Sequence, residues 1–352
     1  MNPTRTITRN RGIVIAVGIV GLSMLAGCER GGRTVVQRGP NGASMGVVYN
    51  TATLNAAYAE NQAPEAAPDV PADGPKAKDV YQNVQVLGDL SAAQFGRLMV
   101  SITQWVAPPD QSCGYCHQGE LSSDALYTKV VARRMLQMVR DINSQWKNHV
   151  GATGVTCYTC HHGQPVPTQA WFDAVPAAHR GLTVDRGYKD APGANVGLTS
   201  LPNNALSTLL VGTAPIRVQG PNALPSGHGV PLTAAEDTYG LMMYMSGSLG
   251  VNCTYCHNTH SFQDWASSPP TRVTAWYGIR MTRYLNNDYL LPLASTLPAN
   301  RLGPMGDGPK VGCATCHKGV YKPLFGATLA QHYPELMGTA AVMPAAAPAT
   351  GE

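Results

Sequence analysis

The feature that most constrains this chain is a pentapeptide pattern, Cys-X-X-Cys-His, that occurs four times. The copies are Cys113-Gly-Tyr-Cys116-His117, Cys157-Tyr-Thr-Cys160-His161, Cys253-Thr-Tyr-Cys256-His257 and Cys313-Ala-Thr-Cys316-His317. The pattern is typical of c-type haem attachment, in which two thiols bond to the vinyl groups and the histidine becomes an axial iron ligand. Its short spacing lets both sulfurs reach one porphyrin edge while the histidine folds under the iron. The sequence therefore predicts four covalently bound c-type haems.

Disulfide pairs and zinc knuckles are the alternative interpretations of these cysteines. A redox or zinc Cys-X-X-Cys site needs no histidine immediately after the second cysteine, so the four repeated histidines favour haem. Of the nine cysteines, eight are assigned as haem thiols and only Cys28 is left over. We therefore expect no disulfide framework.

The N-terminal sequence suggests a role for Cys28, the cysteine outside the four motifs. Arg5, Arg9 and Arg11 lead into an apolar run over residues 13–26 that is too short for a comfortable membrane span. The run ends in Leu-Ala-Gly before Cys28, which resembles a bacterial lipoprotein signal with cleavage before Cys28 and diacylglycerol on its sulfur. An uncleaved anchor helix is the alternative. Either outcome leaves the rest of the chain outside the cytoplasm, where covalent haem attachment takes place.

Composition indicates the fold class. Only 13% of the residues are charged, against about 25% in soluble proteins, and haem macrocycles would supply much of the missing apolar core. The 37 glycines and 27 prolines favour loops over strands. We expect a mainly α multihaem cytochrome c with extensive loops. The formal charge of +4 includes the signal region and gives no reason to expect a nucleic-acid partner.

The chain divides into segments by composition and motif position. Residues 56–77 are rich in Ala, Pro and acidic side chains without an apolar period, and residues 164–231 repeat Pro, Gly and Asn. The predicted segments are a signal peptide (1–27), a lipid-anchored arm (28–88), a first haem-pair module (89–165), a connecting segment (166–231), a second haem-pair module (232–336) and a flexible tail (337–352). Helices are expected over 91–106, 124–146, 233–248 and 271–288, the third opened by a capping box at Thr233-Ala-Ala-Glu236.

An internal repeat relates the two modules. The stretch Met138-Val-Arg-Asp-Ile-Asn143 is matched by Met281-Thr-Arg-Tyr-Leu-Asn286. The repeat predicts a duplicated ancestor and two haem-pair modules related by pseudo-twofold symmetry. In this alignment Gly278 stands opposite Met135.

A low-spin haem needs a second axial ligand, and methionine raises its reduction potential relative to histidine. The candidates on the predicted helices are Met99 for the first haem, Met135 or Met138 for the second, and one of Met242, Met243 and Met245 for the third. A helix methionine is more often a core side chain, so the choice of ligand within each group of methionines stays open. If Met135 serves the second haem, Gly278 leaves the fourth without an equivalent, and the distant His149 is the natural substitute.

At this point the chain resembles the tetrahaem cytochrome subunit of purple bacterial photosynthetic reaction centres, over roughly residues 90–336. The matching stretches are Thr103-Gln-Trp-Val106, Val130-Val-Ala-Arg-Arg-Met-Leu-Gln-Met138, His149-Val with Thr153-Gly-Val-Thr-Cys157, Leu241-Met-Met243, Ser248-Leu-Gly250, Trp276-Tyr-Gly-Ile-Arg-Met281 and Lys322-Pro-Leu-Phe-Gly326. The resemblance implies that Met99, Met135 and Met242 bind the first three irons. It also implies that His149 and His317 bind the fourth.

The resemblance further implies an electron relay and no enzyme activity. A soluble periplasmic donor, either a small cytochrome c or an iron-sulfur protein, would supply electrons that re-reduce the photo-oxidised bacteriochlorophyll special pair. The expected partners are membrane-embedded reaction-centre subunits, at the periplasmic face of the cytoplasmic membrane, with a lipid anchor at Cys28. Arg272 and Arg280 would either raise the third haem's potential or pair with haem propionates. A multihaem reductase with an open iron position and a free-standing electron conduit are the competing functions.

Overall fold

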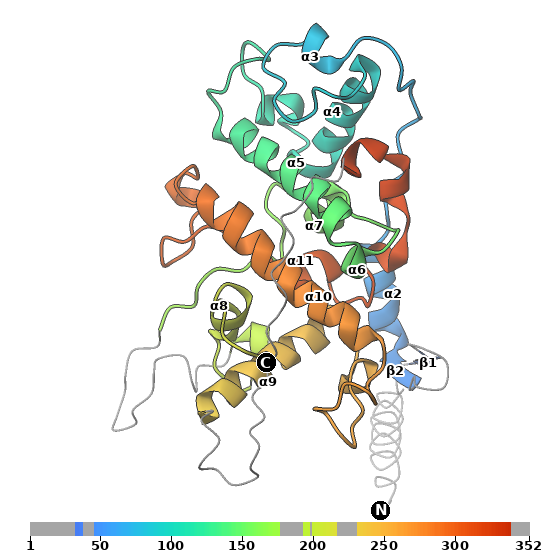
Figure 1. Ribbon diagram of the computed structural model, residues 1–352, viewed down its shortest axis with the longest axis vertical. Helices are drawn as coiled ribbons and strands as arrows, with labels where there is room; N and C mark the ends of the chain where they lie inside the picture. Colours follow the sequence, from blue (N-terminus) through green and yellow to red (C-terminus); the bar gives the residue numbers. More distant parts are fainter. Residues whose placement is uncertain (1–31, 38–45, 177–192, 198, 217–230, 339–352) are drawn as a thin grey trace, which may run out of the picture.

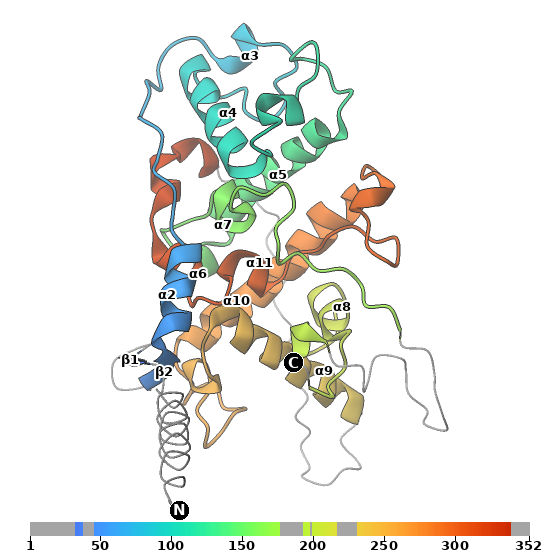
Figure 2. The ribbon, with the colours of Figure 1, turned by 180° about the vertical axis from the view of Figure 1, so that it is seen from behind.

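The computed structural model describes residues 32–37, 46–176, 193–197, 199–216 and 231–338. Helices dominate this part of the chain, as the sequence predicts, and its strands form one two-stranded sheet. In Figure 1, α3, α4 and α5 lie at one end of the long axis, α8 and α9 lie towards the other, and α10 runs obliquely between them. Figure 2 shows the same order from behind.

The α-helices are α2 (Thr51–Glu60), α3 (Ala77–Val80), α4 (Ala92–Val106), α5 (Tyr127–Gln145), α6 (Lys147–Val150), α7 (Cys157–His161), α8 (Ala205–Leu210), α9 (Leu232–Leu249), α10 (Thr271–Tyr284) and α11 (Cys313–His317). A π-helix, η4 (Leu285–Leu290), continues α10. The 3-10 turns are η1 (Ser112–Tyr115), η2 (Ala194–Val196), η3 (Cys253–Tyr255), η5 (Leu291–Leu293), η6 (Ala299–Arg301), η7 (Pro323–Gly326), η8 (Leu329–His332) and η9 (Pro334–Leu336).

The strands β1 (Arg33–Gln37) and β2 (Gly46–Asn50) pair antiparallel, with Val35 opposite Val48. The Tyr49 hydroxyl donates to the Gly250 carbonyl at 3.0 Å, which ties this hairpin to the end of α9. The start of the described chain therefore lies beside the second half of the molecule.

The helices follow the predicted ranges with local differences. Helix α4 opens with a capping box between Ser91 and Gln94, because each side chain accepts a hydrogen bond from the other residue's backbone. Helix α9 begins at Leu232, directly after Pro231, so Thr233 lies inside the first turn and makes no cap. The predicted capping box at Thr233 is wrong because the helix begins at Leu232, two residues before the start that a Thr233 cap requires.

Two segments expected to lack helices contain them. Helix α2 covers residues 51–60, entirely within the predicted arm, and the Asn50 side chain caps its first turn. Helix α8 lies within the predicted connecting segment and buries Leu206, Leu209 and Leu210. Six residues are fewer than two helical turns, so α8 leaves no readable period in the sequence.

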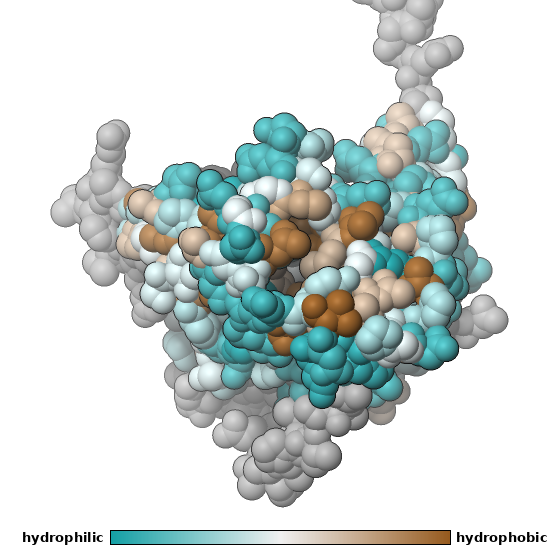
Figure 3. All heavy atoms as spheres, turned by 90° about the horizontal axis from the view of Figure 1, so that it is seen from above, coloured by the Kyte–Doolittle hydropathy of each residue, from teal (hydrophilic) through white to brown (hydrophobic). Residues whose placement is uncertain are grey.

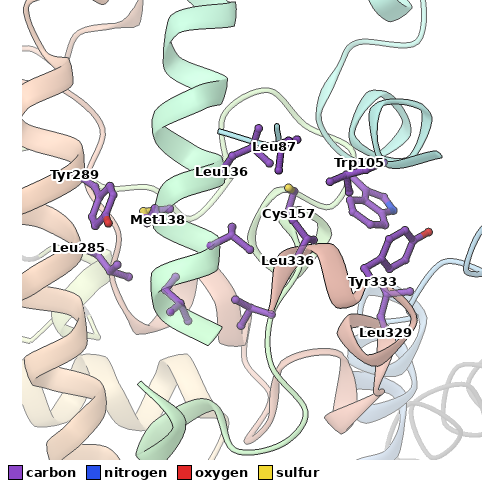
Figure 4. Close-up of a cluster of buried hydrophobic side chains, with 14 of the residues drawn as sticks. Leu87, Trp105, Leu136, Met138, Cys157, Leu285, Tyr289, Leu329, Tyr333 and Leu336 are labelled. Carbon is purple, nitrogen blue, oxygen red and sulfur yellow. The ribbon is translucent and has the colours of Figure 1, made fainter. Parts of the chain in front are cut away.

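The larger hydrophobic core lies where α4, α5, η4 and the C-terminal turns meet. Figure 4 shows its labelled side chains, with Trp105 beside Tyr333 and Cys157 in the middle of the cluster. The Trp105 and Tyr333 rings meet edge to face, with centroids 4.7 Å apart. A second cluster joins α8, α9 and α10 through Leu206, Leu241 and Ile279 among others. The described chain thus has two hydrophobic cores, and the larger one combines residues from both predicted modules.

The segment after α2 lies against the first half. Arg97 on α4 donates to the carbonyl of Ala67 at 2.7 Å and pairs with Glu335 at 3.1 Å, and both side chains of that pair are almost fully buried. Replacing one partner of such a buried ion pair lowers the free energy of unfolding strongly, because it leaves the other charge buried and uncompensated. This contact holds the segment and the C-terminal turns together on α4.

Some expectations fall outside the described residues. The predicted signal peptide, the lipidation site Cys28 and residues 339–352 of the predicted tail belong to this group. Within the described ranges, none of the helices has the length and hydrophobicity needed to cross a membrane.

Candidate haem sites

The four Cys-X-X-Cys-His motifs adopt two conformations that alternate along the chain. The first and third form the 3-10 turns η1 and η3, whereas the second and fourth form the short helices α7 and α11. In the first and third motifs a threonine at the start of the next long helix donates to the tyrosine carbonyl, Thr128 to Tyr115 and Thr271 to Tyr255. In the other two, a threonine inside the motif accepts from the backbone before it, Thr159 from Thr156 and Thr315 from Gly312.

The motif histidines share one orientation. Each Nδ1 lies within 3.1 Å of a backbone carbonyl a few residues later, and a carbonyl can only accept, so Nδ1 carries the proton. The carbonyls belong to Leu121, Gln164, Phe262 and Val320. This hydrogen bond leaves the Nε2 lone pair free for a metal, as in most protein histidine ligands.

His149 has the same hydrogen-bond pattern without belonging to a motif. It lies on α6, a separate turn that follows α5 after Trp146, rather than at the end of the helix that carries Met135. Its Nδ1 donates to the Thr274 carbonyl on α10 at 3.0 Å. Its ring centroid lies 6.1 Å from that of His317. An iron bound by both Nε2 atoms at metal–nitrogen distances of about 2 Å would hold the ring centres roughly 6 Å apart.

Gly278 makes room for His149. A Cβ atom at Gly278 would lie 2.6 Å from Cε1 and 2.8 Å from Nδ1 of the His149 ring, closer than real atoms approach. The internal repeat aligns this glycine with Met135, which has a long side chain at the equivalent position of α5. The imidazole from the first half thus occupies the space that a side chain on α10 would otherwise fill.

A cavity of about 720 Å³ joins the first two motifs, within the size range of cofactor sites. Met99, His117, Met135 and His161 line it, together with the cysteines of both motifs. Figure 3 looks onto the end formed by α3, α4 and α5 and shows brown hydrophobic side chains around a hollow. The structure therefore brings the predicted ligands of the first and second haems to one apolar space.

The methionine candidates differ in their surroundings. Met138 is 8% exposed and belongs to the hydrophobic core, whereas Met135 is less buried and packs at the edge of that core. On α9, Met242 and Met245 pack against the second cluster, and Met243 lies beside Gly197. Met242 lies away from the cavity of the first two motifs, and its pairing with His257, like those of Met99 with His117 and Met135 with His161, stays a prediction.

One expectation about the cysteines needs correction. The structure joins Cys160 of the second motif to Cys316 of the fourth by a disulfide, although the sequence predicts that both bond to haem and that no disulfide forms. A sulfur in a disulfide cannot also bond to a vinyl group. The reason for the pairing is proximity, because α7 packs against α11 and the two Cα atoms lie 4.3 Å apart. The second and fourth motifs are therefore neighbours in space.

Burial sets the protonation of the remaining groups. It lowers the pKa of His149 and His161, and it lowers the pKa of His317 to about 4, so all three imidazoles are neutral at neutral pH, as metal ligands must be. Burial also raises the pKa of the Cys157 and Cys313 thiols to about 12. These thiols are protonated and weakly nucleophilic in the folded chain.

The structure adds two residues that the sequence analysis did not single out as functional. Asn143 exchanges hydrogen bonds with the backbone of Val155, two residues before the second motif, and Asn286 does the same with Val311 before the fourth. Both asparagines are buried. They are the last residues of the two matched stretches of the internal repeat, so the repeat could have identified them from the sequence. Their hydrogen bonds to Val155 and Val311, here called the asparagine clamps, fix the backbone just before the second and fourth motifs.

Arg272 and Arg280 both lie on α10 and stack on tryptophans. Arg272 covers the Trp265 ring at 4.0 Å and donates to the Asp264 carbonyl at 2.8 Å, while Arg280 lies 4.5 Å from the Trp276 ring. The Arg272 contacts hold the loop that follows the third motif, whereas Arg280 and Trp276 pair within α10 itself.

The residues present fit a haem better than a bare metal ion. Among the described residues, no group of three or more His, Cys, Asp or Glu side chains lies close enough to hold a metal, and a zinc knuckle needs four. Just before His149 in the sequence, the buried Trp146 Nε1 and Gln145 Oε1 have no hydrogen-bond partner among the described residues. Such unpaired buried polar atoms are rare in folded proteins.

Comparison with known proteins agrees with this geometry. The family model described as photosynthetic reaction centre cytochrome C subunit matches residues 29–337. The chain belongs to this family. The photosynthetic reaction center cytochrome c subunit of Rubrivivax gelatinosus is 50% identical over 336 residues, which cover 95% of this chain and 91% of the relative. The subunit so named from Thermochromatium tepidum is 46% identical, over 99% of this chain and 84% of its own length.

A third relative with the same description, from Roseobacter denitrificans, is 39% identical over 93% of this chain and 92% of its own length. The resemblance drawn from the sequence is thereby confirmed. As a reaction-centre cytochrome c subunit, the chain is an electron-transfer protein with covalently bound haem that associates with the photosynthetic reaction centre.

Proposed function

We propose that this subunit carries four c-type haems and re-reduces the photo-oxidised bacteriochlorophyll special pair with electrons from a soluble periplasmic donor. The attachment residues are Cys113, Cys116, Cys157, Cys160, Cys253, Cys256, Cys313 and Cys316. The axial pairs are Met99 with His117, Met135 with His161, Met242 with His257, and His149 with His317. When bound, the haems would accept and pass on single electrons.

The observation that carries this proposal is the facing pair of His149 and His317. Their rings are spaced for one iron, both Nδ1 atoms are engaged by carbonyls, and Gly278 leaves the space that His149 needs. An enzyme that binds a small molecule at iron needs one open coordination position. A ligand brought from the other half of the chain to close the fourth site favours electron transfer over a reductase.

The chain's own residues control the potentials. The methionines of the first three pairs favour higher potentials than the two histidines of the fourth pair, other influences being equal. The side chains around the 720 Å³ cavity are mainly apolar, which lowers the polarity around the first two sites. Axial ligand, burial and nearby charge together tune haem potentials over about 0.8 V.

The two halves act as haem-pair modules in this proposal, with α5 and α10 as equivalent helices. The matched asparagine clamps and the alternating motif conformations support a duplicated, pseudo-twofold arrangement. The contact between α7 and α11 makes the second and fourth haems neighbours across the two modules.

Haem attachment precedes complete folding in this proposal. The disulfide between Cys160 and Cys316 must first exchange with an external dithiol, which is oxidised to a disulfide while Cys160 and Cys316 become the two thiols that haem attachment needs. The thiols of Cys157 and Cys313 are protonated once buried, and the thiolate is the reactive form. An open, reduced chain avoids both obstacles.

The subunit acts at the periplasmic face of the cytoplasmic membrane in this proposal. A diacylglycerol on Cys28 would hold it there together with the membrane-embedded subunits. A single lipid modification binds a membrane weakly, so a protein partner or further acylation is needed as well. The soluble donor is a small cytochrome c or an iron-sulfur protein.

The deciding experiment is flash-induced haem oxidation in native membranes. A short flash should bleach reduced c-type haem absorbance as the special pair recovers, and membranes from a strain that lacks this subunit should show slow recovery without the haem signal. Equally fast recovery in both membranes would contradict the relay. An absorption spectrum of the reduced protein with and without carbon monoxide tests the closed coordination, and a carbon monoxide shift would favour a reductase.

A further inference from the structure

Arg301 belongs to the second half of the chain but reaches the cavity of the first two motifs. It ends the turn η6, and its Nε donates to the Tyr127 hydroxyl at 3.3 Å. Its Nη2 donates to the hydroxyl of Tyr115, inside the first motif, at 3.4 Å. All three side chains line the 720 Å³ cavity. The guanidinium is therefore held at the wall of a space that two haems are proposed to share.

The charge of Arg301 has no carboxylate partner among the described residues. The other described cations of the cavity wall do, since Lys129 and Arg133 pair with Asp124 and Lys310 pairs with Asp307. Glu120 also lines the cavity but makes no ion pair with Arg301. Among the described residues, the half-buried guanidinium of Arg301 donates hydrogen bonds only to the phenol oxygens of Tyr115 and Tyr127.

We infer that Arg301 binds a propionate carboxylate of a haem in this cavity and raises the reduction potential of that haem. The inference rests on the proposed haem positions. The planar guanidinium fork suits a carboxylate, and the bonds to Tyr115 and Tyr127 fix its orientation before the carboxylate arrives.

The direction of the effect follows from charge. A cation beside a haem disfavours the more positive ferric state, and a propionate paired with the cation no longer stabilises that state. Loss of Arg301 therefore lowers the potential. The affected haem is the first or the second, because the motifs of those two haems line the cavity with Arg301.

The test is a spectroscopic redox titration of the haem-loaded protein with Arg301→Gln and Arg301→Lys. In R301Q, the ratio of oxidised to reduced haem at the wild-type midpoint should rise about tenfold for one haem, which corresponds to ~59 mV. R301K keeps the charge but loses the fork, so its shift should be smaller. Tyr127→Phe removes one bond to the guanidinium and should give a small shift of the same sign.

Arg134→Gln is the matched control. Arg134 lies on α5, bonds to Gln137 and stacks on Tyr289, but does not line this cavity. Its substitution should leave the first two midpoints unchanged. Four unchanged midpoints in R301Q would overturn the inference, as would equal shifts in R301Q and R301K or a shift confined to the third or fourth haem. The covalent haem count of the denatured protein tests the proposed function separately, because fewer than four haems would contradict that proposal whatever the midpoints are.

Discussion

Helices α5 and α10 carry the two matched stretches of the internal repeat, yet they present different groups to the candidate haem sites. Helix α5 carries Met135 at the wall of the 720 Å³ cavity, whereas α10 carries Gly278 at the aligned position. The space above Gly278 is filled by His149, from the turn that follows α5. One half therefore supplies its own candidate ligand and the other receives it from its neighbour.

The comparison separates what the two matched stretches share from what they do not. Asn143 and Asn286 make the same pair of hydrogen bonds to the backbone of the valine before a motif. The side chain at the aligned helix position differs, methionine on α5 and glycine on α10. Under the proposed duplication, the asparagine clamps were kept while the candidate ligand changed.

The largest expected effect comes from removing the asparagine clamps, which the two matched stretches share. Asn143→Ala and Asn286→Ala each remove three hydrogen bonds between a buried amide and the backbone. Each should lower the free energy of unfolding by about 3 kcal/mol or more, because the backbone groups left behind stay buried and unpaired. Chemical denaturation with the haems attached measures this change.

Asn287→Ala is the control for the asparagine clamps. Asn287 is the exposed neighbour of Asn286, with bonds to Val211 and Arg283, and its loss should cost about 0.5 kcal/mol or less. A much smaller effect for Asn143→Ala than for Asn286→Ala would show that the clamps are equivalent in geometry but not in energy.

A smaller effect is expected where the halves differ. Gly278→Ala would put a Cβ atom 2.6 Å from the His149 ring. Overpacking costs typically 1–3 kcal/mol, partly offset by ~1 kcal/mol of better helix propensity. We expect a net loss of about 1–2 kcal/mol in unfolding free energy, together with a disturbed absorption spectrum of the fourth haem.

Gly247→Ala on α9 is the matched substitution, since a Cβ atom there meets nothing within 4 Å. It should be neutral or stabilise by up to ~1 kcal/mol. If Gly278→Ala behaves in the same way and leaves the spectrum of the fourth haem unchanged, His149 does not ligate that haem.

The smallest expected effect concerns the ligand on α5. Met135→His should convert the second site to the ligand type of the fourth and lower its potential, so that the oxidised-to-reduced ratio at the wild-type midpoint rises at least tenfold, or ~59 mV. A redox titration measures the shift. Met138→Leu conserves volume in the core and should leave all four midpoints in place. The reverse result would identify Met138 as the ligand.

Much of the scaffold could be predicted from the sequence, because its signals are local. Helix α4 begins where Ser91 and Gln94 form their capping box, and the helical period continues to Val106. Helix α8 was missed because its leucines span too few turns. The prediction of a capping box at Thr233 was wrong because α9 already begins at Leu232, directly after Pro231.

Some features of the candidate sites could also be predicted from the sequence, and others could not. The four motifs and the alignment of Gly278 with Met135 can be recognised in the sequence alone. The close approach of His149 to that glycine, the reach of Arg301 into the opposite half and the proximity of Cys160 to Cys316 are long-range contacts. Such contacts depend on how helices far apart in sequence pack together, and no local pattern encodes them.

The position of His149 also limits the evolutionary history open to this chain. Under the proposed duplication, a half that supplied every ligand from its own helices could have been deleted, exchanged or inherited alone. A fourth site that takes His149 from the turn after α5 and its space from Gly278 on α10 needs both halves. In that proposal, neither half can be lost without the loss of a haem ligand.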